Sequence, residues 1–222
     1  EFNIVIENRV PINSGIVGIV FRGIDKNDNN KSIVVKMLKR GIVDKYYIAY
    51  SELEALVKWI QFVPYLNSIN FTKMIADSKK SILDQTDFNK EFDNIKYFRK
   101  KFQNNRDFII PEVYKTITQH YSNIIVMTDI TGLKYNAIKH FSQDIKYEFA
   151  KLLLKFGYIS ILYHSCINGD FHAGNIFFYI NDDNDLPKYQ LGVIDYGLCY
   201  FPSQENQKTY FNFFYYVQCK KN

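Results

Sequence analysis

Short β-branched runs alternate with turn residues over the first 35 positions. The apolar runs lie at 3–6, 16–21 and 32–35, and the polar stretch 25–30, Asp-Lys-Asn-Asp-Asn-Asn, separates the last two. Runs of this length that are rich in Val and Ile and bounded by Gly, Asn and Asp are typical of strands joined by turns. We therefore predict a β-sheet at the start of the chain.

The hydrophobic period changes to a helical one after residue 45. Apolar residues recur three to four positions apart over 46–62 and over 88–102. Residues 143–163 form a longer and strongly apolar stretch with the same period. This spacing places the apolar side chains on one face of a helix, so we predict helices over these three segments. The aromatic segment 210–217 fits either a helix or a strand.

Further strands are expected at 108–114, 122–127, 177–180 and 191–194, the last two around a polar turn over 181–185. A sheet-rich first part followed by a mainly helical part predicts an α+β fold with two lobes. We place the first lobe at 1–128, with helices inserted into it, and the second, short and mainly helical lobe at 129–222.

The composition is that of a folded globular domain. The 222 residues are 47% hydrophobic and 23% charged, which excludes disorder and collagen-like repeats. The net charge of +5 is spread along the chain without a groove-reading motif, so we expect no nucleic-acid partner. Cys166, Cys199 and Cys219 have no paired spacing, which argues against a zinc site or a disulfide framework and favours a reducing compartment.

No targeting or membrane-spanning segment is expected from the sequence. No window contains the roughly 18 apolar residues that a bilayer-spanning helix needs, and the first ten residues lack the pattern of a signal peptide. We expect an intracellular protein, cytoplasmic or mitochondrial, and whether its native amino terminus is longer stays open. Peripheral membrane contact stays open at this point.

The most specific segment is Asn168-Gly-Asp-Phe-His-Ala-Gly-Asn-Ile176, followed by Val193-Ile-Asp-Tyr-Gly197. Phosphoryl transfer needs oxygen ligands that hold Mg²⁺ on the phosphates and an acidic group near the nucleophile. Asp170, Asn175 and Asp195 would supply these groups. Each Asp has a neighbouring glycine and would also fit an ordinary turn. The presence of both segments in this order favours the catalytic interpretation.

A lysine and two glycines in the first part of the chain point to phosphate binding as well. Lys36 ends the apolar run Ile33-Val-Val-Lys36, where a strand interior has little reason to carry a cation. Gly15 and Gly18 join two strand segments, and glycines there would let backbone N–H groups approach a phosphate chain. The alternatives are an edge lysine that reaches water and an ordinary hairpin.

The order of glycine loop, strand lysine, Asp…Asn and Asp-Tyr-Gly follows that of protein-kinase-like folds. More closely, and over nearly its whole length, the chain resembles the UbiB family of atypical kinases, also called aarF-domain-containing kinases. The resemblance is carried by Ser81-Ile-Leu-Asp-Gln-Thr-Asp-Phe-Asn-Lys-Glu91, expected as a helix, and by Ile110-Pro-Glu-Val-Tyr114. Lys36 and Glu91 are 55 positions apart, which is similar to this family and far more than in ordinary protein kinases.

The resemblance implies a role for each matching residue. Lys36 would pair with Glu91 and contact the nucleotide phosphates, and Asn175 and Asp195 would hold Mg²⁺. Asp170 would orient or deprotonate the attacking hydroxyl or water. The cofactors implied are therefore ATP and Mg²⁺.

The resemblance also implies the nucleotide contacts. Gly15 and Gly18 would lie over the phosphates, and the segment Val126-Met-Thr-Asp-Ile130 would be the hinge beside the adenine. Met127 and Asp129 of this hinge are the expected contacts. For His172, in the pattern Asp-x-His-x-Gly-Asn, we favour a role that braces the catalytic loop.

The chain departs from the family pattern at several positions. Asn13-Ser-Gly-Ile-Val-Gly18 replaces an alanine-rich loop, Gln85 replaces one acid of a Glu-x-Asp pair, Asn168 stands where a His is frequent, and Tyr196 replaces a Phe. None of these changes removes an expected metal ligand. Few residues follow Asp195, so we expect a truncated second lobe.

The resulting hypothesis is a Mg²⁺-dependent, ATP-binding atypical kinase or ATPase of the UbiB type. Its phosphoryl acceptor is unknown, either a lipid-related small molecule or a protein, and the family suggests a link to ubiquinone or other isoprenoid lipids. Two alternatives remain open. A small-molecule kinase of the aminoglycoside or choline type has a similar Gly-Asp-x-His-x-x-Asn loop, and Gln85 with the short second lobe would also suit a pseudokinase that acts as a nucleotide-responsive binding module.

Overall fold

The computed structural model of the chain describes residues 3–60, 62 and 69–219, which divide into two units. The first unit comprises 1–92 and 114–127, and the second comprises 93–113 and 128–222. The lobe boundary expected after residue 128 lies next to the junction at 127, whereas residues 93–113 group with the second unit.

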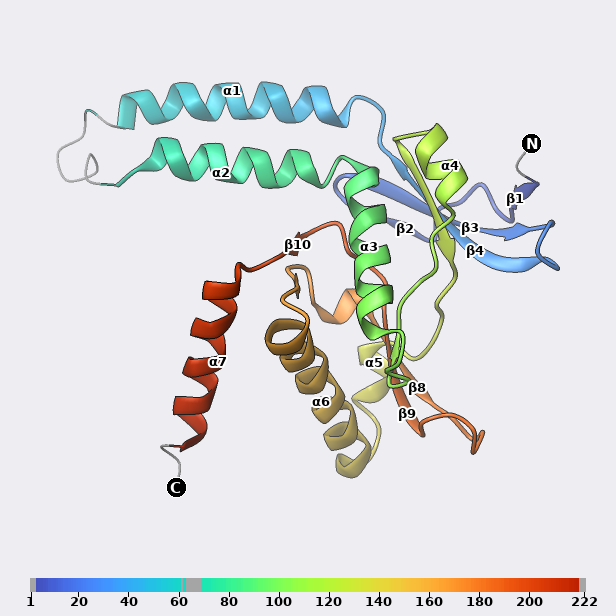
Figure 1. The fold of residues 1–222 in the computed structure, drawn as a ribbon. Helices are drawn as coiled ribbons and strands as arrows, with labels where there is room; N and C mark the ends of the chain where they lie inside the picture. The colour runs from blue at the N-terminus through green and yellow to red at the C-terminus, as the bar shows by residue number, and fades with distance from the viewer. Residues whose placement is uncertain (1–2, 61, 63–68, 220–222) are drawn as a thin grey trace. The chain divides into compact units, whose positions relative to one another are not determined.

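A five-stranded sheet, in which β3 pairs antiparallel with β1, β2 and β4, forms the centre of the first unit (Figure 1). Its strands follow the order β1-β3-β4-β6, and β2 pairs with β3. The bounds are β1 (Ile4–Ile6), β2 (Asn13–Ser14), β3 (Gly18–Asp25), β4 (Lys31–Leu38) and β6 (Ile124–Thr128). Strands β3 and β4 pair from Gly18 opposite Leu38 to Asp25 opposite Lys31, around the predicted polar turn. The predicted amino-terminal strands are thus confirmed.

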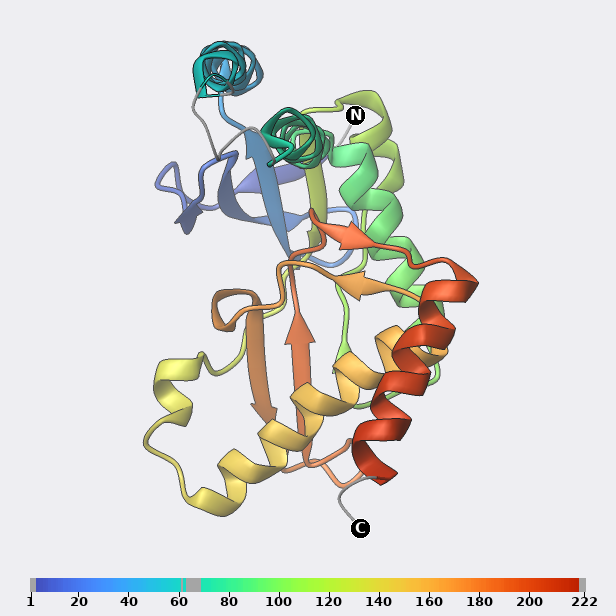
Figure 2. The same ribbon diagram turned by 90° about the vertical axis from the view of Figure 1, so that its left-hand side faces the viewer.

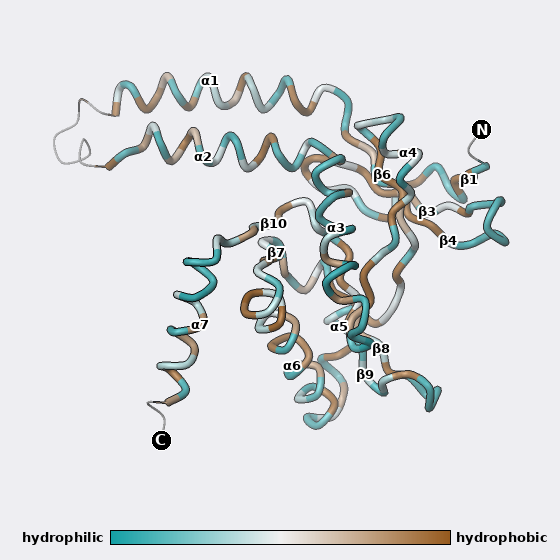
Figure 3. Tube along the Cα trace, viewed as in Figure 1, coloured by the Kyte–Doolittle hydropathy of each residue, from teal (hydrophilic) through white to brown (hydrophobic). Residues whose placement is uncertain are grey.

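Hydrophobic residues of β4 and β6 form one core of this unit. Ile33, Val35 and Val126 are each at most 6% exposed and pack with Ile117 of the short helix α4 (Lys115–His120). The colouring of Figure 3 shows hydrophobic runs along β4 and β6. Because alternate side chains of a strand point to opposite faces, Ile33 and Val35 reach the same core while Lys36 points to the other side.

Two antiparallel helices with a small core of their own follow the sheet strands. These are α1 (Ile42–Ile60), which includes most of the predicted helix at 46–62, and α2 (Phe71–Asp84) (Figure 1). Tyr50, Val57 and Ile75 are buried between them. The hydroxyls of Tyr50 and Ser78 lie 2.9 Å apart, within hydrogen-bond distance.

The prediction of a single helix over 81–91 is wrong. Helix α2 ends at Asp84, and α3 (Phe88–Phe102) begins after a turn. The Thr86 hydroxyl donates to Leu83 O at 2.7 Å, and the Asp87 carboxylate accepts from the N–H of Asn89 at 3.0 Å. Side chains that bond to nearby backbone groups in this way end one helix and begin the next. The bounds predicted for α3 are confirmed.

The second unit contains a three-stranded sheet and a separate strand pair (Figure 2). The sheet order is β5-β9-β8, and β7 pairs with β10. The bounds are β5 (Phe108–Ile109), β7 (Ile167–Asn168), β8 (Ile176–Ile180), β9 (Tyr189–Val193) and β10 (Cys199–Tyr200). The strand expected over 108–114 is therefore too long, because Pro111 has no N–H to donate to a neighbouring strand.

Three helices accompany this sheet in the second unit. The helices are α5 (Tyr135–Ile138), α6 (Gln143–Tyr158) and α7 (Gln204–Cys219). Helix α6 continues as a π-helical turn, η1 (Ile159–Tyr163), so the helix predicted at 143–163 is confirmed with a change of winding at its end. The segment at 210–217 is helical. None of the described helices is long and apolar enough to span a membrane.

Candidate active site

Lys36 and Glu91 form an ion pair in the first unit. Lys36 Nζ lies 2.9 Å from Glu91 Oε1 and 2.8 Å from Oε2. The Glu91 side chain is 2% exposed and that of Lys36 is 17% exposed. The lysine also lies 5.5 Å from the ring centroid of Phe88, which is fully buried. Strand β4 and the first turn of α3 thus bring together two residues that are 55 positions apart.

The glycine loop is a tight turn between β2 and β3. Gly15 N–H donates to Gly18 O at 3.0 Å, and Lys39 Nζ donates to Gly15 O at 2.6 Å. A Cβ on Gly18 would lie 2.9 Å from Met37 O, so the close pairing of β3 with β4 requires glycine there. A Cβ on Gly15 would meet only Gly18 O, at 3.9 Å. Phosphate binding by this turn stays a prediction.

In the second unit, Asn168 connects the two segments that carry the candidate catalytic residues. Its Oδ1 accepts from the N–H of Asp170 at 2.9 Å, and its Nδ2 donates to Asp195 O at 2.7 Å. Asn168 is 8% exposed. A buried amide that satisfies backbone groups on both segments holds them in one arrangement. Asp170 and Asp195, 25 positions apart in sequence, are therefore linked through one side chain.

The orientation of the Asn175 side chain follows from its hydrogen bonds. Its Nδ2 donates to Asp170 O at 3.1 Å and to Asp170 Oδ2 at 2.9 Å. These two bonds use both hydrogens of the amide nitrogen, so its approach to His172 Nε2 at 3.3 Å is a contact without a third donated hydrogen. Asn175 Oδ1 is the atom of this side chain that can bind a metal, so the geometry fits the predicted role.

His172 is bonded to its own loop. The N–H of Gly174 donates to His172 Nδ1 at 2.9 Å. A backbone N–H can only donate, so Nδ1 is unprotonated, and the neutral ring carries its proton on Nε2. Nε2 lies 3.6 Å from Asp170 Oδ2. This arrangement supports the loop-bracing interpretation.

Asp195 and Tyr196 lie just after the end of β9. Asp195 Oδ1 accepts from the N–H of Gly197 at 2.9 Å, and Asn94 Nδ2 of α3 donates to Tyr196 O at 2.8 Å. The Tyr196 ring is fully buried, 4.9 Å from that of Phe98, and burial raises the pKa of its hydroxyl well above the usual value. The segment after the candidate metal ligand is thus anchored to α3.

The donor chemistry fits Mg²⁺. Among residues 3–60, 62 and 69–219, no cluster of three or more His, Cys, Asp or Glu side chains could enclose a metal. Mg²⁺ is usually held by one or two carboxylates together with waters and substrate phosphates, not by an all-protein cage. One amide oxygen from Asn175 and one carboxylate from Asp195 are a donor set of that kind.

The two expected hinge residues fall on either side of the unit junction. Met127 belongs to the first unit, is 5% exposed and lies within β6. Asp129 follows β6 in the second unit and is partly buried. Contact of either residue with an adenine stays a prediction.

Sequence reasoning assigned no structural role to three residues that organise the loop. Asn168 and Asn94 donate to the backbone carbonyls of Asp195 and Tyr196. Lys134 donates to the carbonyl of Gly174, the residue before Asn175. The spacing of Asn168 two positions before Asp170 is the only local signal, since Asn commonly bonds to the backbone two residues on. The other two contacts span 40 and 102 positions and have no local signature.

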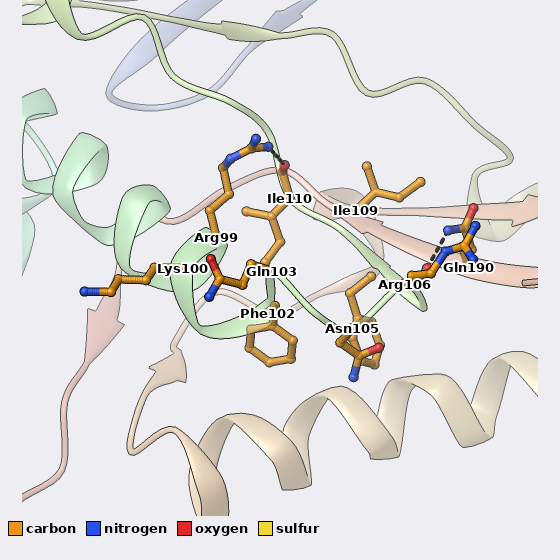
Figure 4. Close-up of a pocket in the computed structure, with 10 residues that line it drawn as sticks. Arg99, Lys100, Phe102, Gln103, Asn105, Arg106, Ile109, Ile110 and Gln190 are labelled. Atoms are coloured by element: carbon orange, nitrogen blue, oxygen red, sulfur yellow. Dashed lines mark hydrogen bonds between the residues drawn. The ribbon is translucent and has the colours of Figure 1, made fainter. Parts of the chain in front are cut away.

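A cavity of about 580 Å³ in the second unit lies away from all of the predicted site residues (Figure 4). It lies at the end of α3 and beside β5, and Arg99, Arg106 and Gln190 are among its lining residues. Arg99 donates to Ile110 O at 3.0 Å, and Arg106 donates to Asp185 O. Gln190 donates to Arg106 O at 2.5 Å. These polar groups are bonded to backbone carbonyls and stabilise the fold around the end of α3.

Comparison with known proteins gives a consistent family match. Residues 7–222 match the model of the ABC1 atypical kinase-like domain. The chain is 29% identical over 167 residues to a probable protein kinase UbiB of Blochmanniella pennsylvanica, covering 72% of this chain and 30% of the relative. It is 27% identical over 188 residues to that of Haemophilus ducreyi, covering 81% and 33%. The chain spans about a third of the length of these relatives.

Solved structures show the same fold. The Rv3197–erythromycin complex from Mycobacterium tuberculosis matches with a TM-score of 0.70 and 18% identity over 89% of this chain and 47% of that one. The Rio2 kinase–ADP/Mg²⁺–phosphoaspartate complex from Chaetomium thermophilum matches with a TM-score of 0.50 and 15% identity over 92% and 51%. The predicted protein-kinase-like α+β fold is confirmed.

Proposed function

Because this chain belongs to the ABC1 family of atypical kinase-like domains and is of the UbiB type, we propose that it binds ATP with Mg²⁺ and transfers a phosphoryl group. The Lys36–Glu91 ion pair carries this proposal. A buried carboxylate costs free energy unless it is paired. Glu91 is 2% exposed, and both of its oxygens bind the ammonium of Lys36. Paired in this way, the lysine is held in one position, as contact with a phosphate chain requires.

The second unit would supply the metal ligands and the acidic group. Asn175 Oδ1 and the Asp195 carboxylate would hold Mg²⁺, which neutralises charge on the phosphates when it is bound. Asp170 accepts from Asn175 through Oδ2 and would orient or deprotonate the attacking hydroxyl or water. Lys36 would stabilise charge on the phosphates in the same reaction. The Rio2 kinase structure with ADP and Mg²⁺ supports the choice of nucleotide and metal.

The proposal names the phosphoryl acceptor only by its chemical class. The resemblance to the UbiB family suggests a lipid-related small molecule, and a protein hydroxyl, which the relatives' name of probable protein kinase suggests, is the other candidate. Fold and nucleotide site do not identify an acceptor, because unrelated acceptors are used by similar folds.

The test is the melting temperature with Mg²⁺ and ATP or ADP, for the wild type and for Lys36→Ala and Asp195→Ala. A ligand at about 100 times its Kd stabilises by about 2.7 kcal/mol, which raises the midpoint of a chain of this size by roughly 5 to 10 °C. We expect this shift in the wild type and a much smaller one in both variants. A folded wild type that no nucleotide stabilises would contradict the proposal.

Phosphate release separates the enzyme from a pseudokinase. We expect the wild type to release phosphate from ATP and Asp170→Asn to bind ATP without releasing it. Binding without release in the wild type would favour the pseudokinase, a nucleotide-responsive binding module. Rapid phosphorylation of an aminoglycoside or of choline would instead favour a small-molecule kinase.

A further inference from the structure

Lys134 lies against the catalytic loop of the second unit. Its Nζ donates to Gly174 O at 2.9 Å and lies 3.6 Å from the centroid of the Phe177 ring. Gly174 directly precedes Asn175, the candidate metal ligand, which in turn is bonded to Asp170. The ammonium group of Lys134 is therefore next to the residues that would handle the phosphates.

The backbone around Lys134 fixes this position. Leu133 N–H donates to Phe178 O at 2.9 Å, and Phe178 N–H donates to Leu133 O at 2.8 Å. A Cβ on Gly132 would lie 3.0 Å from both Phe178 O and the Tyr179 ring, so the segment approaches β8 more closely than another residue would allow. Lys134 is thus carried by a segment that is bonded to the strand following the catalytic loop.

The contacts of Lys134 leave its charge uncompensated. Within the described part of the chain its partners are a neutral carbonyl and an aromatic ring, and no carboxylate pairs with it. Lys134 is exposed as a residue, but desolvation by the atoms around its ammonium group lowers its pKa. A cation that has lost part of its hydration gains free energy when an anion binds beside it. The ammonium has three N–H donors, and the Gly174 carbonyl uses one of them.

We propose that Lys134 binds a phosphate group of the nucleotide, as a second cation in addition to Lys36. This inference rests on the proposed function, because the phosphates belong to the nucleotide that Asn175 and Asp195 would hold through Mg²⁺. Lys134 directly precedes α5, outside the segments 126–130 and 168–176 that carry other predicted site residues.

The test compares ligands that differ in their phosphates. The dissociation constants of ATP, ADP and adenosine are measured with Mg²⁺ for the wild type and for Lys134→Met, Lys134→Gln and Lys134→Arg. We expect about 10- to 100-fold weaker binding of ATP and ADP to the Met and Gln variants, because a charge-assisted hydrogen bond is lost. Adenosine binding should stay within about twofold, since it has no phosphate, and Lys134→Arg should bind ATP nearly as well as the wild type.

Two variants separate charge from structural support. Lys134→Gln keeps a donor for Gly174 O but removes the charge, so normal ATP affinity in this variant would overturn the proposal. Lys188→Met is the matched control, because Lys188 is exposed and lies 5.6 Å from the Tyr189 ring centroid at the far turn of the same sheet. Equal weakening of all three ligands by Lys134→Met would also overturn the proposal and assign a structural role. A folded wild type that binds none of the three would contradict the proposed function itself.

Discussion

At the scale of single residues, Tyr196 combines complete burial with an unsatisfied hydroxyl. Its ring packs on Phe98, but within the described residues its Oη has no hydrogen-bond partner. A buried polar group without a partner costs about 1 to 3 kcal/mol. Phenylalanine has the same shape without this group.

We therefore expect Tyr196→Phe to stabilise the protein by about 1 kcal/mol, or roughly 2 to 4 °C in the melting midpoint. Thermal unfolding of the two proteins in the same buffer measures the difference. Tyr200→Phe is the control, because Tyr200 is 51% exposed and its hydroxyl can reach water. A clear loss of stability in Tyr196→Phe would show that the hydroxyl has a favourable partner.

The cysteines differ in environment in a way that chemical modification can detect. Burial raises the pKa of Cys166 to about 12, and its side chain is fully buried, whereas Cys219 on α7 is exposed. Because the thiolate is the reactive form, Cys166 carries about a thousandfold less of it at pH 8 than an ordinary thiol. We expect iodoacetamide to label Cys219 rapidly in the native protein and Cys166 only after unfolding, as peptide mass spectrometry would show. Fast native labelling of Cys166 would contradict this environment.

At the scale of elements, the Lys36–Glu91 pair joins β4 to the start of α3. Removing one partner of a buried pair leaves the other charge uncompensated, at a cost of about 3 to 5 kcal/mol. We expect Lys36→Met to lower the free energy of unfolding by about 3 kcal/mol in urea titrations. Replacing both residues, by Lys36→Met with Glu91→Leu, should recover most of this loss because no charge is then left buried.

The exposed pair Lys79–Glu54 is the matched control for that cycle. Its nitrogen and oxygen lie 2.8 Å apart, but the two side chains are 27% and 47% exposed. Exposed pairs contribute about 0 to 1 kcal/mol, so Lys79→Met should change stability by less than about 1 kcal/mol. Equal losses from Lys36→Met and Lys79→Met would mean that burial of Glu91 does not determine the strength of its pairing.

The α1–α2 hairpin has a core separate from that of the sheet, so it should loosen independently. Ile75 is 9% exposed between the two helices, and its replacement by alanine removes contacts worth about 2 to 4 kcal/mol. We expect Ile75→Ala to accelerate amide hydrogen exchange in α1 and α2 and to leave β3 and β4 unchanged. Ile48→Ala is the control, because Ile48 is 60% exposed. Faster exchange in β3 and β4 would indicate one cooperative unit.

At the scale of the whole molecule, the elements that could be predicted are those that depend on the local spacing of hydrophobic residues. The alternating apolar runs predicted β3 and β4, and the helical period located α3 at its observed bounds. The break at 85–87 depends on side chains that bond to nearby backbone, and hydrophobic spacing does not detect it. Pro111 shortens the strand expected over 108–114, because a hydrophobic pattern does not register that this residue has no N–H to donate. The long-range bonds of Asn94 and Lys134 require the folded chain, because nothing near them in sequence names their partners.

The proposed function requires that the whole protein bind ATP better with Mg²⁺ than without it. Asn175 Oδ1 and Asp195 offer too few ligands to hold the metal alone, so waters and nucleotide phosphates would complete its coordination. If chelation by EDTA weakens ATP binding tenfold, it removes about 1.4 kcal/mol and lowers the thermal shift by roughly 3 to 5 °C. Melting curves with ATP in Mg²⁺ and in EDTA measure this difference.

The variant Asp195→Asn tests whether this carboxylate is the ligand. Its amide keeps an Oδ1 acceptor for the Gly197 N–H, so the loop should stay folded, but the charge that attracts the metal is lost. We expect the ATP shift of Asp195→Asn to be nearly the same in Mg²⁺ and in EDTA. Asp182→Asn, in the exposed turn between β8 and β9, should respond like the wild type. A full Mg²⁺ response in Asp195→Asn would place the metal on other oxygens, because a neutral amide cannot replace the charge of the carboxylate.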